Sequence, residues 1–177
     1  VIIAPPLPSA ATRWGNRCMD VVGSALLLLL LSPLLLVTYL AIRIDDRGPA
    51  LYRQVRIGKD GQPFNIYKFR TMVKNAGTAS TATNDARILP GCHIVRQLRI
   101  DELPQLVNIL KGEMSFIGPR PVSVAIAENL EARIEQDQNR SILLPGLTGW
   151  AQVSHGYAET EDEEIAKLSY DLFYLKH

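Results

Sequence analysis

The longest feature in the pattern of polar and apolar positions is Val21–Ile42, 22 residues without a charged side chain. About 20 apolar residues are enough for a helix to cross the hydrocarbon core of a bilayer. Ser32-Pro33 lies at the centre of this run, where proline removes a helical hydrogen bond. Arginines flank both ends, whereas a spanning helix usually has its positive charges on one side. The pattern fits either a re-entrant helix with two arms of roughly 11 residues or a kinked spanning helix.

Beyond this run the chain alternates between short strand-like and helix-like patterns. Leu51–Ile57 and Phe64–Met72 are joined by a glycine-bearing loop at 58–61, which predicts a β-hairpin. Residues 73–85 are small and polar and predict a loop. Apolar residues then recur at helical spacing from Leu103 to Leu110, which predicts an amphipathic helix that ends at Gly112. Further helices are predicted at Ile94–Arg99, at Ile126–Arg140 and after the capping box of Thr160 and Glu163.

Composition places the chain among folded domains. It has 177 residues, 47% of them apolar, which favours one domain at 13–177 after an irregular, proline-containing tether at 1–12. Two cysteines and three histidines argue against a disulfide framework or a zinc module. The net charge of +1 combines +7 in residues 1–125 with −6 in residues 126–177. A basic half beside an apolar run favours lipid headgroups or a phosphorylated substrate over nucleic acid.

The acidic pair Asp101-Glu102 directly precedes the amphipathic helix. Carboxylates at this position face the positive end of the helix dipole, which favours their ionised form. An ionised aspartate can act as a nucleophile or bind a divalent cation. Aspartate is also a common helix N-cap, so the position alone leaves a structural role open.

Basic residues outside charged helix faces change this balance. Arg120 lies between two prolines in the segment Ile117–Pro121, which must be extended or turned. Carboxylates, a divalent cation and several arginines are the groups that phosphoryl transfer requires. Glycine-rich loops of the ATP-binding or NAD-binding kind are absent from the sequence. The basic residues in apolar or glycine and proline contexts are Lys68, Arg70, Arg96, Arg99 and Arg120.

Four segments together resemble one known family, the bacterial sugar transferases, which are monotopic polyprenyl-phosphate phosphoglycosyl transferases. The similarity runs from about Arg13 to the end of the chain and includes the Ser32-Pro33 pair. The four segments, which follow the order of the family, are Tyr67–Met72, Leu98–Leu106, Gly112–Pro121 and Pro145–Val153.

The resemblance implies a mainly helical α+β fold. A re-entrant helix at about 18–43, bent at Ser32 and Pro33, would hold the protein in the bacterial inner membrane. A small β-hairpin and amphipathic interface helices would lie at its cytoplasmic face. The family normally continues past the position of His177, which predicts that this chain is part of a longer protein.

The resemblance also implies a reaction. The family moves a sugar-1-phosphate from a nucleotide (UDP) diphosphate sugar to polyprenyl (undecaprenyl) phosphate and releases UMP, which begins polysaccharide or glycoprotein glycan assembly in the membrane. Asp101 matches the nucleophile that forms a covalent phosphosugar intermediate, and Glu102 matches its partner. Mg²⁺ is the implied cofactor, held by Asp101. Arg96 and Arg120 match arginines at the phosphates, and Lys68 and Arg70 match basic positions nearby.

One position departs from the family pattern and two other functions remain open. Leu144 stands where the family usually has a basic residue, so one phosphate contact is missing or comes from another residue such as Arg140.

The same acidic pair would also serve a membrane-bound phosphohydrolase. A non-catalytic membrane scaffold for glycan assembly, with Asp101 as a helix cap, is the other alternative. The sugar, the polyprenol length and the oligomeric state are not predicted.

Overall fold

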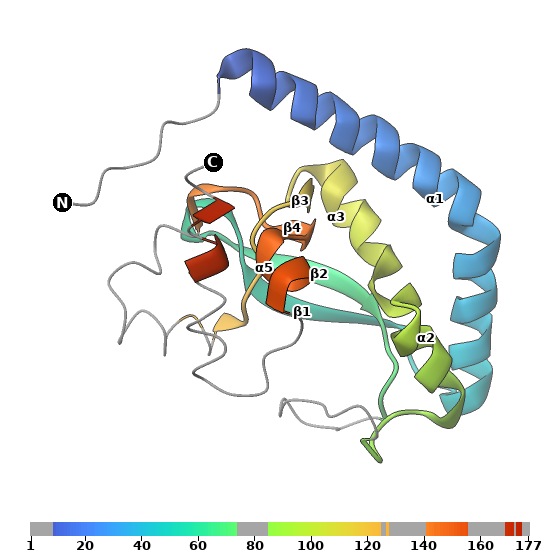
Figure 1. Cartoon of the computed structure of the whole chain (residues 1–177). Helices are drawn as coiled ribbons and strands as arrows, with labels where there is room; N and C mark the ends of the chain where they lie inside the picture. Colours follow the sequence, from blue (N-terminus) through green and yellow to red (C-terminus); the bar gives the residue numbers. More distant parts are fainter. Residues whose placement is uncertain are drawn as a thin grey trace.

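The computed structural model describes residues 9–73, 85–124, 127, 141–155, 169–171 and 173–174. In this part of the chain, a long helix runs along one side of two small sheets and several short helices (Figure 1). The helices and strands are α1 (Ala10–Asp46), β1 (Leu51–Ile57), β2 (Pro63–Phe69), α2 (His93–Gln97), α3 (Leu106–Lys111), β3 (Ser115–Ile117), β4 (Gly146–Thr148) and α5 (Trp150–His155). Single 3-10 turns lie at Lys59–Gly61, Pro90–Cys92 and Ile100–Gln105. A mainly helical fold with a small hairpin is therefore confirmed.

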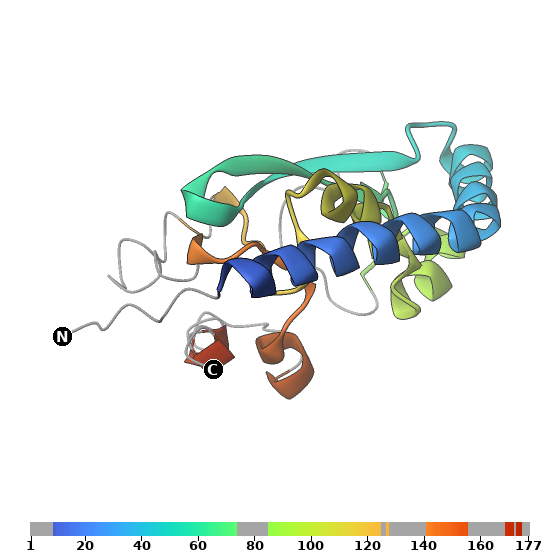
Figure 2. The same cartoon turned by 90° about the horizontal axis from the view of Figure 1, so that it is seen from above.

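The helix α1 is one continuous helix of 37 residues, and the expectation of two separate arms is wrong. It continues through Pro33, where the Ser32 hydroxyl donates a hydrogen bond to the carbonyl of Leu29 at 2.7 Å. In a regular helix the N–H of residue 33 would donate to that carbonyl, and proline has no N–H. The helix bends instead, so that its last turns point in a different direction from its first (Figures 1 and 2).

The two faces of α1 have different environments. By length and composition, α1 is the one helix among the described residues that is able to cross a membrane. On its outer face, Leu29 and Leu30 are each 75% exposed, and the described residues leave this apolar face uncovered. On its inner face, Leu28 and Leu31 pack against a buried cluster to which β2 and α3 contribute. The members of that cluster are Ile66, Leu106, Ile109 and Met114.

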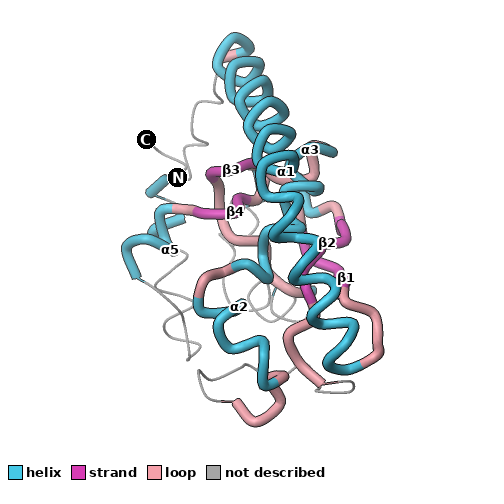
Figure 3. Tube along the Cα trace, turned by 90° about the vertical axis from the view of Figure 1, so that its right-hand side faces the viewer, coloured by secondary structure: helices cyan, strands magenta, loops and turns pink. Residues whose placement is uncertain are grey.

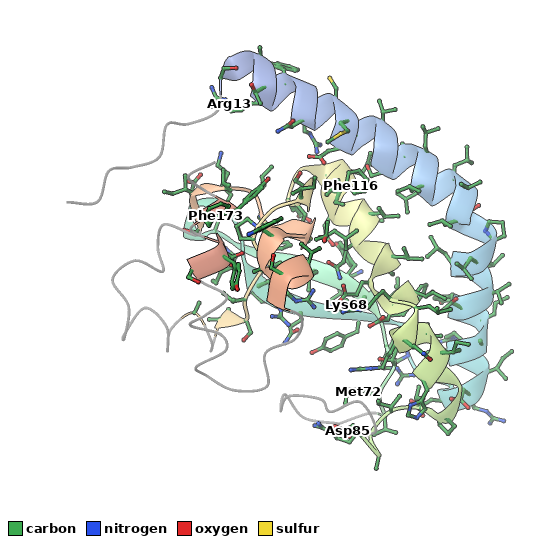
Figure 4. The ribbon with its side chains drawn as sticks, in the orientation of Figure 1. Arg13, Lys68, Met72, Asp85, Phe116 and Phe173 are labelled. Atoms are coloured by element: carbon green, nitrogen blue, oxygen red, sulfur yellow. The ribbon has the colours of Figure 1, made fainter. Side chains whose placement is uncertain are left out.

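Polar contacts fix the first half of α1 on the rest of the fold. The guanidinium of Arg17 donates hydrogen bonds to two carbonyls at the end of α3, at 2.7 and 2.8 Å. Asp20 is buried and accepts hydrogen bonds from the Phe116 N–H at 3.0 Å and the Ser115 hydroxyl at 3.1 Å. Figure 4 shows Phe116 between α1 and α3. The start of α1 is thus bound to both α3 and β3.

The predicted hairpin is confirmed. The strands β1 and β2 pair in antiparallel register from Leu51 opposite Phe69 to Ile57 opposite Pro63. The second strand is shorter than predicted, since its pairing with β1 ends at Phe69 and Met72 forms an isolated bridge with Ile88. Most of the loop predicted at 73–85 lies outside the described residues.

The helices predicted around the acidic pair are present in modified form. The helix predicted at Ile94–Arg99 is α2, which is confirmed in its position. The next one begins as the 3-10 turn Ile100–Gln105 and becomes α3. It stops at Gly112, as predicted, because this glycine adopts a φ of 88°. The helix predicted at 126–140 and the one predicted after Thr160 lie almost entirely outside the described residues.

A second sheet was not predicted. The strands β3 and β4 are parallel, and β4 and α5 lie in or just after the segment Pro145–Val153, for which no strand or helix is predicted above. Figure 3 shows the two sheets as separate strand pairs behind α1. At Gly118, Gly146 and Gly149, an added Cβ would overlap with backbone atoms of the neighbouring segment. The two segments pack closely because these three residues lack side chains.

Candidate active site

The acidic pair lies inside the 3-10 turn Ile100–Gln105, not at a helix N-cap. The turn follows Arg99, which adopts a left-handed conformation with a φ of 58°. The residue that precedes α3 is Gln105. One carboxylate oxygen of Asp101, Oδ1, is buried and has no hydrogen-bond partner among the described residues. The interpretation of Asp101 as a helix cap is therefore wrong.

Glu102 is the anionic centre of a cluster of three cations. Its Oε1 lies 2.9 Å from Lys68 Nζ and 2.9 Å from an Arg120 guanidinium nitrogen. Arg99 lies at 3.8 Å from the same oxygen. Burial alone would raise the pKa of Glu102, but Arg120 and Lys68 outweigh it and lower the pKa to about 2. This side chain is an anion at any physiological pH.

Asp101 has a contrasting environment. Burial, and then the negative charge of Glu102, raise the pKa of Asp101 above its ordinary value. The charges of Lys68 and Arg96 act in the opposite direction and do not fully compensate. For Asp101, the expectation that its position would favour the ionised form is wrong, because desolvation is the larger effect. The ionised form is favoured for Glu102 alone, through its cationic partners.

Lys68 and Arg96 reach the acidic pair from β2 and α2. Lys68 extends from β2 towards the turn that carries Glu102 (Figure 4). Burial lowers the pKa of Lys68, and the neighbouring Glu102 opposes this shift. Arg96 donates a hydrogen bond to the Thr71 hydroxyl at 3.3 Å, and its charge acts on Asp101.

Arg120 is positioned by the close contact between the β3 and β4 segments. The Gly118 N–H donates to the Thr148 carbonyl at 2.9 Å, and the Gly146 N–H donates to the Pro119 carbonyl at 2.8 Å. On the other side of Arg120, the guanidinium of Arg56 donates to the carbonyl of Pro121 at 3.2 Å. The predicted Pro-Arg-Pro segment is thus held on both sides of its arginine.

Two groups of predicted residues lie away from Glu102. Arg70 is buried and forms an ion pair with Asp46 at 2.6 Å, which links β2 to the end of α1. Ser32 and Pro33 lie on the exposed side of α1. Leu144 is partly buried beside Gly118, and Arg140 lies outside the described residues.

Sequence reasoning missed residues that hold the site together from a distance. Arg56 and Thr71 contact site residues or their neighbours but carry no local signal. Asn108 is completely buried and is hydrogen-bonded to β2. One signal was available for Asn108, since it is a single polar residue in the apolar run Leu106–Leu110.

The geometry defines a class of protein. A buried carboxylate with a vacant hydrogen-bonding position, beside a second carboxylate that binds cations, is suited to an enzyme that transfers phosphoryl groups. The chain belongs to the bacterial sugar transferase family, whose model matches residues 11–177.

Three relatives have names that specify a reaction. The chain is 40% identical to a UDP-N-acetylgalactosamine-undecaprenyl-phosphate N-acetylgalactosaminephosphotransferase of Aeromonas hydrophila, over 97% of this chain and 41% of that protein. It is 42% and 38% identical to UDP-glucose:undecaprenyl-phosphate glucose-1-phosphate transferases of Caulobacter vibrioides and Escherichia coli. Those alignments cover 97% and 95% of this chain, and 66% and 37% of the two relatives. The chain therefore spans between about two fifths and two thirds of these relatives.

Proposed function

We propose that the protein transfers a sugar-1-phosphate from a UDP-sugar to undecaprenyl phosphate and releases UMP. The observation that carries the proposal is Asp101, which is buried, has a carboxylate oxygen without a described partner, and lies among cations. The names of the three relatives support the same two substrates. The names of these relatives differ in the sugar, so the proposal covers UDP-sugars as a class and no particular sugar. The proposed reaction is the first membrane step of glycoconjugate assembly.

Asp101 serves as the nucleophile in this proposal. Its oxygen attacks the phosphorus that carries the sugar, the bond to the UMP oxygen breaks, and UMP leaves with that electron pair. An oxygen of undecaprenyl phosphate then attacks the same phosphorus, which restores the Asp101 carboxylate and forms a sugar-diphosphate lipid. Asp101 attacks in its carboxylate form and undecaprenyl phosphate through an anionic oxygen, so neither attack includes the removal of a proton by a separate base.

Glu102 has a positioning role that follows from its partners. A carboxylate with a pKa of about 2 and two cations at 2.9 Å is a poor proton carrier at neutral pH. Its charge holds Lys68 and Arg120 side by side, where both can face the oxygens of a diphosphate. Arg96 supplies a further positive charge beside Asp101.

The residues at the site fit Mg²⁺. The described residues contain no group of three or more His, Cys, Asp or Glu side chains that could hold a metal. Mg²⁺ is commonly held by one or two carboxylates together with substrate phosphate oxygens and water. Oδ1 of Asp101, which has no hydrogen-bond partner among the described residues, is suited to serve as such a carboxylate ligand. When bound, the ion would neutralise diphosphate charge and assist departure of UMP.

We propose that α1 is a re-entrant helix at the cytoplasmic face of the bacterial inner membrane, which makes the protein monotopic. The bend, the exposed leucines and the flanking arginines support this placement. Ala11→Cys and Lys59→Cys, each in a Cys18→Ser background, should be labelled from the same side of intact cells. Labelling from opposite sides would show that α1 spans the membrane.

The reaction is tested with purified protein, undecaprenyl phosphate, Mg²⁺ and a panel of UDP-sugars. We expect UMP release together with a lipid-linked sugar diphosphate for at least one donor, and no product with chelator. Free sugar phosphate in place of the lipid product would identify a phosphohydrolase. UMP release by none of the donors would support the scaffold alternative.

A further inference from the structure

The β1–β2 sheet has two strands. On the edge of β2 that is not paired with β1, a side chain forms hydrogen bonds with the backbone. The Asn108 carboxamide oxygen accepts a hydrogen bond from the Tyr67 N–H at 3.1 Å. Its Nδ2 donates to the Asn65 carbonyl at 2.7 Å. These are the two backbone groups with which a neighbouring strand would pair. The amide of Asn108 therefore replaces a third strand at this point.

The hydrogen bonds of Asn108 leave it little freedom. Its side chain is fully buried, and Nδ2 also donates to Glu113 Oε2 at 2.6 Å. Both amide hydrogens and one acceptor position are thus used. The backbone carbonyl of Asn108 accepts from the N–H groups of Gly112 and Glu113, which fixes the end of α3 as well. Asn108 joins β2 rigidly to α3.

Lys68 is the next residue after Tyr67 on β2, and its partner Glu102 lies in the turn that leads into α3. The distance between Lys68 Nζ and Glu102 Oε1 depends on how closely β2 lies against α3 and this turn. Asn108 sets that spacing by direct bonds to the backbone beside Lys68. We infer that Asn108 is a positioning residue for Lys68, an inference that depends on the proposed function for its catalytic consequence.

A merely structural Asn108 would affect stability without a specific effect on Lys68. The matched control is Arg17, which bonds α3 from α1. Its two side-chain hydrogen bonds among the described residues both go to carbonyls of α3, and neither goes to β2 or to the acidic pair. Arg17→Met removes two hydrogen bonds to α3, and Asn108→Leu removes the side-chain bonds between α3 and β2. Both variants should unfold at a lower temperature than the wild type.

The decisive test is a double-mutant cycle on the kcat for UMP release, using the whole chain in detergent micelles. Asn108→Leu should lower kcat by at least about tenfold, since small displacements of charged groups at a reaction centre have large effects. In a Lys68→Met background the same change should alter kcat by less than about twofold, because the group it positions is gone. Arg17→Met should change kcat by less than about twofold in both backgrounds.

A second measurement is independent of turnover. The rate at which acetic anhydride modifies Lys68, followed by mass spectrometry, should rise several-fold in Asn108→Leu and stay unchanged in Arg17→Met. Asn108→Asp keeps the acceptor for Tyr67 and loses the donors, so it should give smaller changes in the same directions. Equal loss of kcat in both Lys68 backgrounds, or an unchanged Lys68 modification rate, would overturn the inference. Failure of both Asn108→Leu and Asn108→Asp to fold would also overturn the inference, because Asn108 would then have a role in stability alone.

The proposed function fails in a different way. If the wild type releases no UMP from any donor, that function is rejected before variants are compared. The Lys68 modification rate would then still decide whether Asn108 positions this lysine.

Discussion

The two carboxylates of the turn Ile100–Gln105, those of Asp101 and Glu102, differ in how completely they are paired with cations. Glu102 contacts Lys68 and Arg120 at 2.9 Å, and its pKa is far below the ordinary value. Asp101, the adjacent residue, has a buried oxygen without a described partner and a raised pKa. Adjacent residues of similar chemistry therefore have different environments. In the proposed reaction, the paired carboxylate of Glu102 organises cations, and that of Asp101 stays available for substrate.

The contrast has a physical origin in the elements that reach each side. Glu102 meets β2 and the Pro-Arg-Pro segment, both of which bring a cation on a rigid support. Asp101 is near Arg96, whose guanidinium is bonded to Thr71. A nucleophile surrounded by direct ion pairs would be less reactive, because those pairs would have to break before it could attack.

The largest expected effect comes from Asp101→Asn. This substitution keeps the shape of the side chain and removes the proposed nucleophile, so UMP release should fall by about 10⁴-fold or more. Thermal unfolding should occur at the same temperature as the wild type or higher, because a buried charge is removed. Radiolabelled sugar phosphate should be trapped on the wild type and not on this variant. Near-normal turnover by Asp101→Asn would end the covalent mechanism.

Glu102→Gln should lower both activity and stability, whereas Asp101→Asn should lower activity alone. The loss of negative charge releases Lys68 and Arg120 from their common partner, so kcat should fall by about 100-fold. Stability should also fall, by about 2 kcal/mol, because two cations lose a charged hydrogen-bond acceptor. Denaturant unfolding of both variants side by side measures this. Equal stability of the two variants would contradict the contrast between the carboxylates.

The pH dependence of stability sharpens the same comparison. The pKa of Glu102 in the folded protein, about 2, lies below its ordinary value of 4.5. Its stabilising effect is therefore complete above pH 4.5 and is lost as the pH falls towards 2, by about 3 kcal/mol. Asp101 has a raised pKa, so its ionisation reduces stability as the pH rises through that pKa. In urea titrations, Glu102→Gln should flatten the loss of stability below pH 4.5, and Asp101→Asn should remove the loss that accompanies rising pH above 3.8.

The same comparison shows what the sequence was able to predict. The hairpin and the helix end at Gly112 depend on neighbours within a few residues, and these two predictions are confirmed. The cap at Asp101 and the dipole effect were wrong because burial of that carboxylate results from the packing of β2 and α2 on the turn. The sequence left open whether Pro33 separates two helical arms or only bends one helix, and the Ser32 hydroxyl contacts the carbonyl that Pro33 leaves without its usual donor.

Contacts between distant residues account for most of the remainder. The partner of Arg70 is Asp46, at the end of α1, and no pattern around Arg70 indicates it. The β3–β4 pair joins segments about 30 residues apart through glycines whose spacing alone does not reveal a sheet. Asn108 reaches backbone groups more than 40 residues away. Local periodicity contains no information about such pairings.

The smallest effect expected here is that of Arg120→Lys. This variant tests how far the cluster of Glu102 and its cations depends on geometry as well as on charge. The glycine-supported Pro-Arg-Pro segment fixes the backbone, so a lysine at 120 keeps the positive charge near Glu102 but has no planar fork to contact two oxygens at once. We expect kcat/KM for the UDP-sugar to fall by about tenfold, which corresponds to about 1.4 kcal/mol of transition-state stabilisation. Stability should change little, since the ion pair can re-form. Arg120→Met, which also removes the charge, should lose more activity than Arg120→Lys. If lysine and arginine support equal kcat/KM, charge alone is sufficient, and the rigid support of this arginine has no catalytic consequence.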